Sequence, residues 1–155
     1  MIRVFIFLSL SLLIAVIFIS CNQCNYVDCA SDNYDGQFRI VSATTGKDLV
    51  FGSNGIYNKS QIKFYAVKGG DTTFFDYHPV NFPNIGYDSI LFVRFYPKTD
   101  VAYMQLSNGD VDTLAISFVV AKGSKCCGDI TEIASFRYNN LIDIPGDKGT
   151  QELKK

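Results

Sequence analysis

Hydrophobic residues are arranged in two different ways along this chain. Residues 4–19 form a nearly continuous apolar run that follows Arg3 and leads to Ser20-Cys21. From Gln37 onward, apolar and polar residues alternate in short runs separated by Gly, Asn, Asp and Pro. Alternation with a period of two is typical of half-buried β-strands, and no stretch has the convincing period of an amphipathic helix. The pattern predicts a leader followed by a β-rich body.

The body is predicted to contain seven or eight short strands. They fall within residues 37–42, 48–51, 56–67, 72–77, 88–96, 101–107, 111–121 and 130–138. Turn residues recur about every ten positions, a spacing that favours an all-β, antiparallel β-sandwich, immunoglobulin-like or similar, over a barrel.

Two connections are informative. Asn108-Gly109 separates two of the predicted strands, and this pair readily takes the positive φ angles of a tight hairpin turn. After it, residues 114, 116, 118 and 120 alternate on one face, which we place in the core. Residues 78–87 contain two prolines and a glycine, so they are predicted to be the longest irregular loop.

The domain organisation follows from where the pattern starts and stops. We expect a leader at 1–20, a polar tether at 21–36, one β-domain at 37–142 and a polar tail at 143–155 that frays. The chain has 155 residues, and once the leader is removed the remainder has the length of one ordinary domain. Phe and Tyr can fill its core, since aromatics make up 14% of the chain.

The leader has the form of a bacterial secretory signal. One basic residue precedes an apolar run that is shorter than the roughly 20 residues needed to cross a bilayer. A small residue then stands before Cys21, which favours cleavage at that point and lipid attachment to the Cys21 sulfur. An uncleaved membrane helix is the alternative.

The five cysteines are consistent with that interpretation. Lipid on Cys21 leaves four thiols, which are Cys24, Cys29, Cys126 and Cys127, and an even number can close as two disulfides in an oxidising compartment. A bond between adjacent Cys126 and Cys127 is disfavoured by geometry, so the 24/29 segment is predicted to be tied twice to the 126–127 loop. Unpaired thiols and a zinc site are the alternatives, and the vicinal pair is poorly spaced for zinc.

Charge and motifs exclude several functions. The formal net charge is -1, from 14 Lys and Arg against 15 Asp and Glu, which gives no field that would attract nucleic acid. The one histidine, His78, has no assignable catalytic partners, and no nucleophile elbow is present. Asn108, Asp110 and Asp112 have the spacing that starts a calcium loop but lack its distal Glu. We therefore expect no cofactor, no metal and no catalysis.

Aromatic residues are the remaining candidates for binding. Seven of them gather in the middle of the chain: Tyr57, Tyr65, Phe74, Phe75, Tyr77, Phe82 and Tyr87. Exposed rings can stack on sugars or anchor a protein partner, and Tyr77, Phe82 and Tyr87, in or beside the predicted loop, are the candidate binding residues. The alternative is that these rings fill the core.

Several short motifs carry a family resemblance. Ile19-Ser20-Cys21 resembles a lipobox, and residues 45–49, 112–114 and 126–128 are similar to segments of small lipoproteins from Bacteroidetes. The resemblance implies acylation of Cys21 and attachment to a bacterial membrane, on the periplasmic side of the outer membrane because no acidic residue closely follows the cysteine. It also implies O-glycosylation at Asp-Ser/Thr motifs, which occur at Thr72, Ser89 and Thr113, and Thr72 is the most accessible candidate.

The function expected from sequence is that of a cell-envelope lipoprotein without enzymatic activity. Its partners are the lipid bilayer, through Cys21, and an envelope protein, for which it would be a binding or accessory subunit. The alternative is a carbohydrate-binding module that uses exposed Tyr and Phe.

Overall fold

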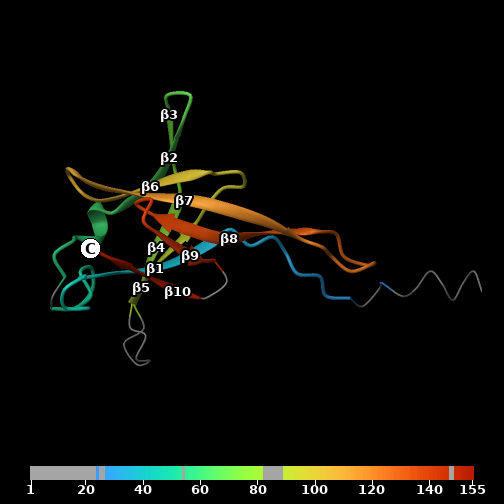
Figure 1. Ribbon diagram of the computed structural model, residues 1–155, viewed down its shortest axis with the longest axis horizontal. Helices are drawn as coiled ribbons and strands as arrows, with labels where there is room; N and C mark the ends of the chain where they lie inside the picture. The colour runs from blue at the N-terminus through green and yellow to red at the C-terminus, as the bar shows by residue number, and fades with distance from the viewer. Residues whose placement is uncertain (1–23, 25–26, 54, 82–88, 147–148) are drawn as a thin grey trace, which may run out of the picture. The chain divides into compact units, whose positions relative to one another are not determined.

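A computed structural model describes Cys24 and residues 27–53, 55–81, 89–146 and 149–155, and these residues form an all-β protein (Figure 1). The chain divides into two compact units. One comprises Asp32–Val120 and Thr131–Lys155 and holds nearly all of both sheets, and the other combines Ala121–Ile130 with the part of the chain up to Ser31. No helix within the described residues is long and apolar enough to cross a bilayer.

The described residues contain ten strands and one short 3-10 turn, η1 (Lys59–Gln61). The strands are β1 (Asp35–Val41), β2 (Lys63–Lys68), β3 (Asp71–Phe74), β4 (Asp76–Asn81), β5 (Ser89–Arg94), β6 (Val101–Ser107), β7 (Asp110–Ala121), β8 (Ile130–Tyr138), β9 (Ile142–Pro145) and β10 (Thr150–Lys154).

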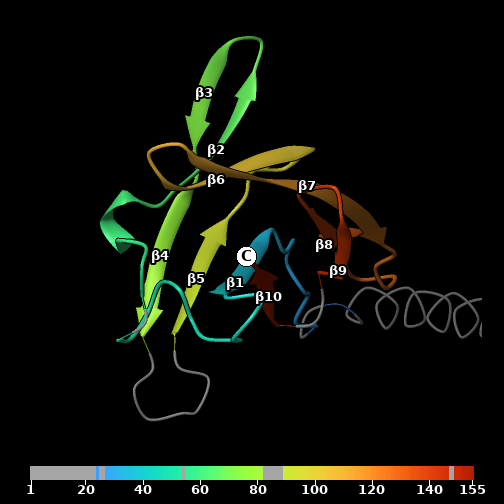
Figure 2. The ribbon, with the colours of Figure 1, turned by 60° about the vertical axis from the view of Figure 1, so that its left-hand side comes forward.

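These strands form two sheets, which confirms the predicted sandwich (Figures 1 and 2). The four-stranded sheet has the order β10-β1-β5-β4, and the six-stranded sheet has the order β3-β2-β6-β7-β8-β9. β1 and β10 are parallel, while β1–β5, β4–β5, β2–β3, β2–β6, β6–β7 and β8–β9 are antiparallel. The order differs from that of an immunoglobulin domain, whose first two strands are neighbours in one sheet, because β1 and β2 lie in different sheets.

The core lies between the sheets and is rich in phenylalanine. Phe38 on β1 contacts Phe64 on β2, Phe95 after β5 and Phe136 on β8, with ring centroids 5.1 to 6.3 Å apart. All four rings are almost completely buried. Since aromatic pairs in such arrangements contribute about 0.5–1.5 kcal/mol beyond their area burial, this cluster supplies much of the specific packing between the sheets.

The predicted strand 72–77 is divided between the two sheets. Phe75, which is buried, separates β3 from β4, and its backbone N–H donates to the Phe64 carbonyl. The chain then continues as β4 through His78 and Pro79, so the prediction of a loop beginning at His78 is wrong. Proline is tolerated there because β4 is an edge strand, which can lack one backbone donor.

The hairpin predicted around Asn108-Gly109 is confirmed as β6 and β7. Of the Asn108-Gly109 pair, only Gly109 has a positive φ, of 95°. The register between β6 and β7 shifts between Gln105 and Ser107. On the face predicted to be buried, Leu114 and Ile116 lie in the core, but Val120 is 63% exposed. The prediction is wrong for Val120, because the end of β7 extends beyond the core and its side chains are mostly exposed.

The short strand predicted at 48–51 is replaced by a side-chain-stabilised bend. Asp48 Oδ1 accepts hydrogen bonds from the backbone N–H groups of Val50 and Phe51, each at 2.8 Å. Asp often satisfies nearby backbone donors in this way and thereby competes with sheet formation. Val50 and Phe51 still reach the core, so their apolar character was correctly interpreted.

Both predicted boundaries of the domain require correction. The tail at 143–155 does not fray, because β10 pairs with β1 over Gln37–Val41, and Leu153 is completely buried. At the other end, β1 begins at Asp35, inside the predicted tether. The tail was mistaken for a flexible segment because an edge strand with alternating polar residues has only one apolar face.

Candidate functional site

The four cysteines of the described residues form two disulfides. Cys24 bonds to Cys126 and Cys29 to Cys127, with Cα–Cα distances of 5.3 and 5.5 Å. This confirms the predicted double tie and removes the zinc and free-thiol alternatives for these residues. Disulfides of this kind are typical of extracytoplasmic proteins. Elsewhere in the described part of the chain, no group of three or more His, Cys, Asp or Glu could hold a metal ion.

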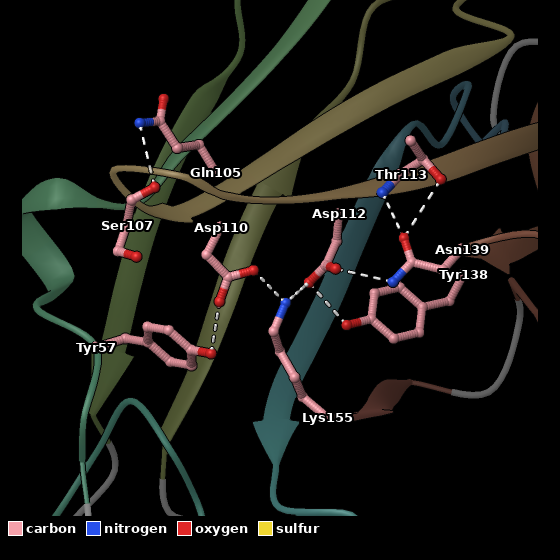
Figure 3. A network of polar contacts seen from close by, with 9 residues as sticks. All are labelled: Tyr57, Gln105, Ser107, Asp110, Asp112, Thr113, Tyr138, Asn139 and Lys155. Carbon is pink, nitrogen blue, oxygen red and sulfur yellow. Dashed lines mark hydrogen bonds and ion pairs between the residues drawn. The ribbon is translucent and has the colours of Figure 1, made fainter.

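The densest polar cluster is centred on Lys155 (Figure 3). Its ammonium group lies 2.5 Å from Asp110 Oδ1 and 2.6 Å from Asp112 Oδ2. Tyr57 donates to Asp110 at 2.8 Å, and Tyr138 donates to the same oxygen of Asp112 at 2.8 Å. We call these five residues the lysine clasp. The clasp joins Lys155, which directly follows β10 of the four-stranded sheet, to β7 and β8 of the six-stranded sheet.

Asparagine completes the environment of the buried carboxylate. Asn139 donates from Nδ2 to Asp112 Oδ1 at 2.8 Å, while its own Oδ1 accepts from the backbone N–H of Thr113. Asp112 is 7% exposed at its side chain, and a carboxyl group buried to this extent requires hydrogen-bond partners. Both oxygens of Asp112 therefore accept hydrogen bonds, Oδ1 from Asn139 and Oδ2 from Lys155 and Tyr138.

The electrostatics of the clasp favour a fixed ion pair. Burial raises the pKa of Asp110, but hydrogen bonds from Lys155 and Tyr57 outweigh it and keep this pKa below its ordinary value. Burial lowers the pKa of Lys155, and its two carboxylate partners outweigh that effect and raise it. Burial and the contact with Asp112 raise the pKa of Tyr138. Lys155 and Asp110 therefore remain charged near neutral pH, and the clasp acts as a structural connection between the sheets.

Sequence reasoning missed the clasp, although one signal was present. Asp112 shares the inward face of β7 with Leu114 and Ile116. A carboxylate on a core-facing position requires a cation and hydrogen-bond donors. The calcium reading of Asp110 and Asp112 does not hold, since the Lys155 ammonium occupies the position between them.

A row of aromatic side chains crosses the outer face of the six-stranded sheet. Phe74 on β3 lies opposite Tyr65 on β2, and Tyr65 lies opposite Tyr103 on β6. The centroids of Tyr65 and Tyr103 are 5.4 Å apart with the rings 20° from parallel, and Phe74 is 5.9 Å from Tyr65. Phe74 is 56% exposed, and the two tyrosines are half-buried. We call these three residues the aromatic row.

The aromatic row differs from the residues selected from the sequence. Tyr77 is half-buried on β4, packs on Phe64 with centroids 5.4 Å apart and donates to the Lys59 carbonyl. Burial raises the pKa of Tyr77 to about 12, which agrees with a packing role. Phe82 and Tyr87 lie outside the described residues. Tyr65 and Phe74 belonged to the group of seven, and alternation of Tyr65 with core-facing Phe64 was the signal for its outward direction.

The candidate glycosylation site is exposed. Thr72 lies on β3, an edge strand whose four residues are all exposed. Among the other two matches, Ser89 is buried, and Thr113 is half-buried and bonded to Asn139. Thr72 is the most accessible of the three matching residues, as expected.

An open pocket of about 480 Å³ lies beside the aromatic row. Its lining includes Val67 and Lys68 of β2, Phe75, Tyr96, Lys98, and Val101 at the start of β6. The lining combines apolar side chains with two lysines. Sequence reasoning did not find this pocket, because its two sides come from segments that are about thirty residues apart.

Comparisons with known proteins gave no match. No protein-family model fits the chain, and neither a curated protein nor a solved structure is detectably similar to it.

Proposed function

We propose that this protein is a lipid-anchored cell-envelope lipoprotein that binds another envelope protein and has no catalytic role. The observation that carries the proposal is the aromatic row, in which the exposed ring of Phe74 and the half-buried rings of Tyr65 and Tyr103 lie side by side on one face of the sheet. Tyr and Phe are effective anchors at protein interfaces because they bury a large area with few rotatable bonds. Exposed Val67 and Val101 lie near the row and extend its apolar character.

Membrane attachment through Cys21 is supported by two features of the chain. The apolar run before Cys21 has the length of a secretory signal. The other four cysteines bond to one another, which leaves Cys21 as the sulfur for acylation. We place the protein on the periplasmic side of the outer membrane, as the resemblance to Bacteroidetes lipoproteins implies.

Replacing Cys21 tests the anchor. Cys21→Ala is expected to abolish labelling with a radioactive fatty acid and to leave a precursor that still carries its leader. Asn22→Ala is the matched control and should be labelled and processed normally. Normal processing and labelling of Cys21→Ala would refute the anchor.

Photo-crosslinking tests the binding surface. A photoreactive phenylalanine at position 74 is expected to give one discrete cross-linked product in intact membranes, because this ring would lie in the interface. The same probe at Val120, which is also exposed on a strand, is the control and should give none. Adding Tyr65→Ser and Tyr103→Ser should reduce the product at position 74 at least tenfold, since truncating a tyrosine that anchors an interface typically costs about 2 kcal/mol or more.

The cross-linking experiment also has a clear negative outcome. Equal products from positions 74 and 120, or a product at position 74 that survives loss of both tyrosines, would exclude the aromatic row as the interface. Urea unfolding of the same variants checks that they remain folded.

Carbohydrate binding is the second candidate. The observation in its favour is Phe74, whose exposed ring is available for stacking on a sugar. It ranks second because Tyr65 and Tyr103 stack on each other, so their facing surfaces are not free to receive a sugar ring. Saturable binding on a glycan array that Phe74→Ser abolishes would reverse this order.

A further inference from the structure

The six-stranded sheet is split between β2 and β6. Pairing runs from Lys63 opposite Gln105 to Tyr65 opposite Tyr103 and stops there. Both strands extend beyond this point, because β2 continues to Lys68 and β6 begins at Val101. In both ribbon views the β2–β3 hairpin projects away from the rest of the sheet (Figures 1 and 2). We call the opening between residues 66–68 and residues 96–101 the fork.

The pocket described above fills the fork. Its lining includes Val67 and Lys68 on one side, and Tyr96, Lys98 and Val101 on the other. Beyond Tyr65, the β6-facing side of β2 has no ladder partner in the register between the two strands. An extended peptide can add to such a strand through backbone hydrogen bonds, while its alternate side chains enter the pocket.

The charge of the pocket indicates which side chains it would receive. Lys68 and Lys98 contribute two positive charges and Asp100 one negative charge, so the lining carries a net charge of +1. Within the described residues neither lysine forms an ion pair, and Lys68 forms none with its cross-strand neighbour Asp71. Two lysines in a lining that also contains apolar side chains are complementary to a carboxylate carried on an extended segment.

Lys98 also has a backbone conformation that a lysine rarely adopts. Its φ is 64°, directly after Pro97, in a turn closed by the Thr99 N–H and the Tyr96 carbonyl. Glycine or asparagine normally occupies this position of a turn, because a Cβ is disfavoured there. A lysine placed in the fork against local preference indicates that its ammonium group serves another purpose.

We propose that the fork binds an acidic, extended segment of the partner protein. The segment adds to β2 beyond Tyr65, directs carboxylates at Lys68 and Lys98, and places an apolar side chain against Phe75 and Tyr96. This inference rests on the proposed function, which it deepens by naming the chemistry of the partner, and the aromatic row continues the same interface on the adjoining sheet face.

Selection from a displayed library of random peptides on the purified, disulfide-bonded protein tests the inference. Enriched peptides are expected to carry Asp or Glu at alternate positions, the spacing that places side chains on one face of a strand. A synthetic copy of the most enriched peptide should bind at least tenfold more tightly than its Asn and Gln counterpart in fluorescence polarisation. No enrichment, or enrichment without acidic residues, would overturn the inference.

Two variants locate the binding in the fork. Lys98→Gly is expected to keep or raise the stability of the protein, because glycine adopts the positive φ of this turn without strain. The same substitution is expected to weaken peptide binding at least fivefold. Lys68→Gln should weaken it similarly, whereas Lys122→Gln, an exposed lysine elsewhere, should not. Unchanged affinity in the Lys68 and Lys98 variants, or equally tight binding of succinate, would contradict an acidic peptide site.

Failure here is distinguishable from failure of the proposed function. If the cross-link from position 74 persists in Lys68→Gln/Lys98→Gly, the aromatic row binds its partner without the fork, and only the acidic segment is excluded. If position 74 gives no cross-link in the otherwise unchanged protein, the proposed interface itself fails.

Discussion

Removing both disulfides is expected to lower the free energy of unfolding by about 7 kcal/mol, whereas removing either one alone is expected to cost only about 2 to 3 kcal/mol. The bonded residues are separated by 102 and 98 positions, so each disulfide by itself closes a loop that the chain-entropy relation values at about 5 kcal/mol. Once one is formed, the other closes only the short ring of residues 24–29 and 126–127.

Paired serine replacements provide the measurement. Cys24→Ser/Cys126→Ser and Cys29→Ser/Cys127→Ser should lose similar amounts of stability in urea unfolding, and each should remain folded. The variant lacking all four thiols should unfold at a far lower urea concentration or be unfolded without urea. A loss of about 5 kcal/mol from each pair alone would show that the two disulfides act independently, contrary to this expectation.

Lys155→Ala is expected to destabilise the protein by about 2–3 kcal/mol, because it leaves two adjacent carboxylates without their cation. The side chains of Lys155 and Asp110 are 23% and 30% exposed, so the effect should fall below that of a fully buried pair. Lys154→Ala is the matched control, since Lys154 is an exposed neighbour on β10. Equal urea midpoints for the two variants would exclude a stabilising clasp.

A double-mutant cycle identifies the cause of the loss. Asp112→Asn should destabilise the unaltered protein, because the buried carboxylate is bonded to both Lys155 and Tyr138. In the Lys155→Ala background the same change should be neutral or stabilising, since it removes an unpaired buried charge. Additive effects of the two substitutions would indicate that Lys155 contributes through packing alone.

The effect of Lys155 should also depend on pH in a defined direction. The pKa of Asp110 is held below its ordinary value of 3.8, so its stabilising contribution is complete above about pH 4 and is lost as the pH falls through the lowered pKa. The pKa of Lys155 is raised, so its contribution persists below about pH 10 and is lost as the pH rises through the raised pKa. The difference in the free energy of unfolding between the unaltered protein and Lys155→Ala should therefore be largest between these two pH limits and should shrink beyond each of them.

Much of the fold was predictable because its signals are local. The Asn108-Gly109 hairpin and the strand 130–138 were found at or near their observed bounds, since both depend on alternation and turn residues within a short window. The double tie between the 24/29 segment and the 126–127 loop also followed from local geometry, because adjacent Cys126 and Cys127 are poorly placed to bond to each other, but that argument leaves two pairings open and only the structure distinguishes them.

The errors arose where distant segments decide the structure. β10 is held by β1 and by the clasp, and nothing near residues 150–154 in the sequence indicates either partner. The split of 72–77 into two strands depends on Phe75 reaching the core between the sheets. The fork exists only because β2 and β6 stop pairing after Tyr65, which no window of sequence reveals.

The pairing of β1 with β10 constrains when the domain can fold during synthesis. Phe38 pairs with Gln151 and Ile40 with Leu153, so one sheet cannot be completed until almost the whole chain is available. Contacts this distant in sequence form late and slow folding, because a long loop must close before they form. A chain whose residues 150–154 are still inside the ribosome would therefore lack its finished four-stranded sheet.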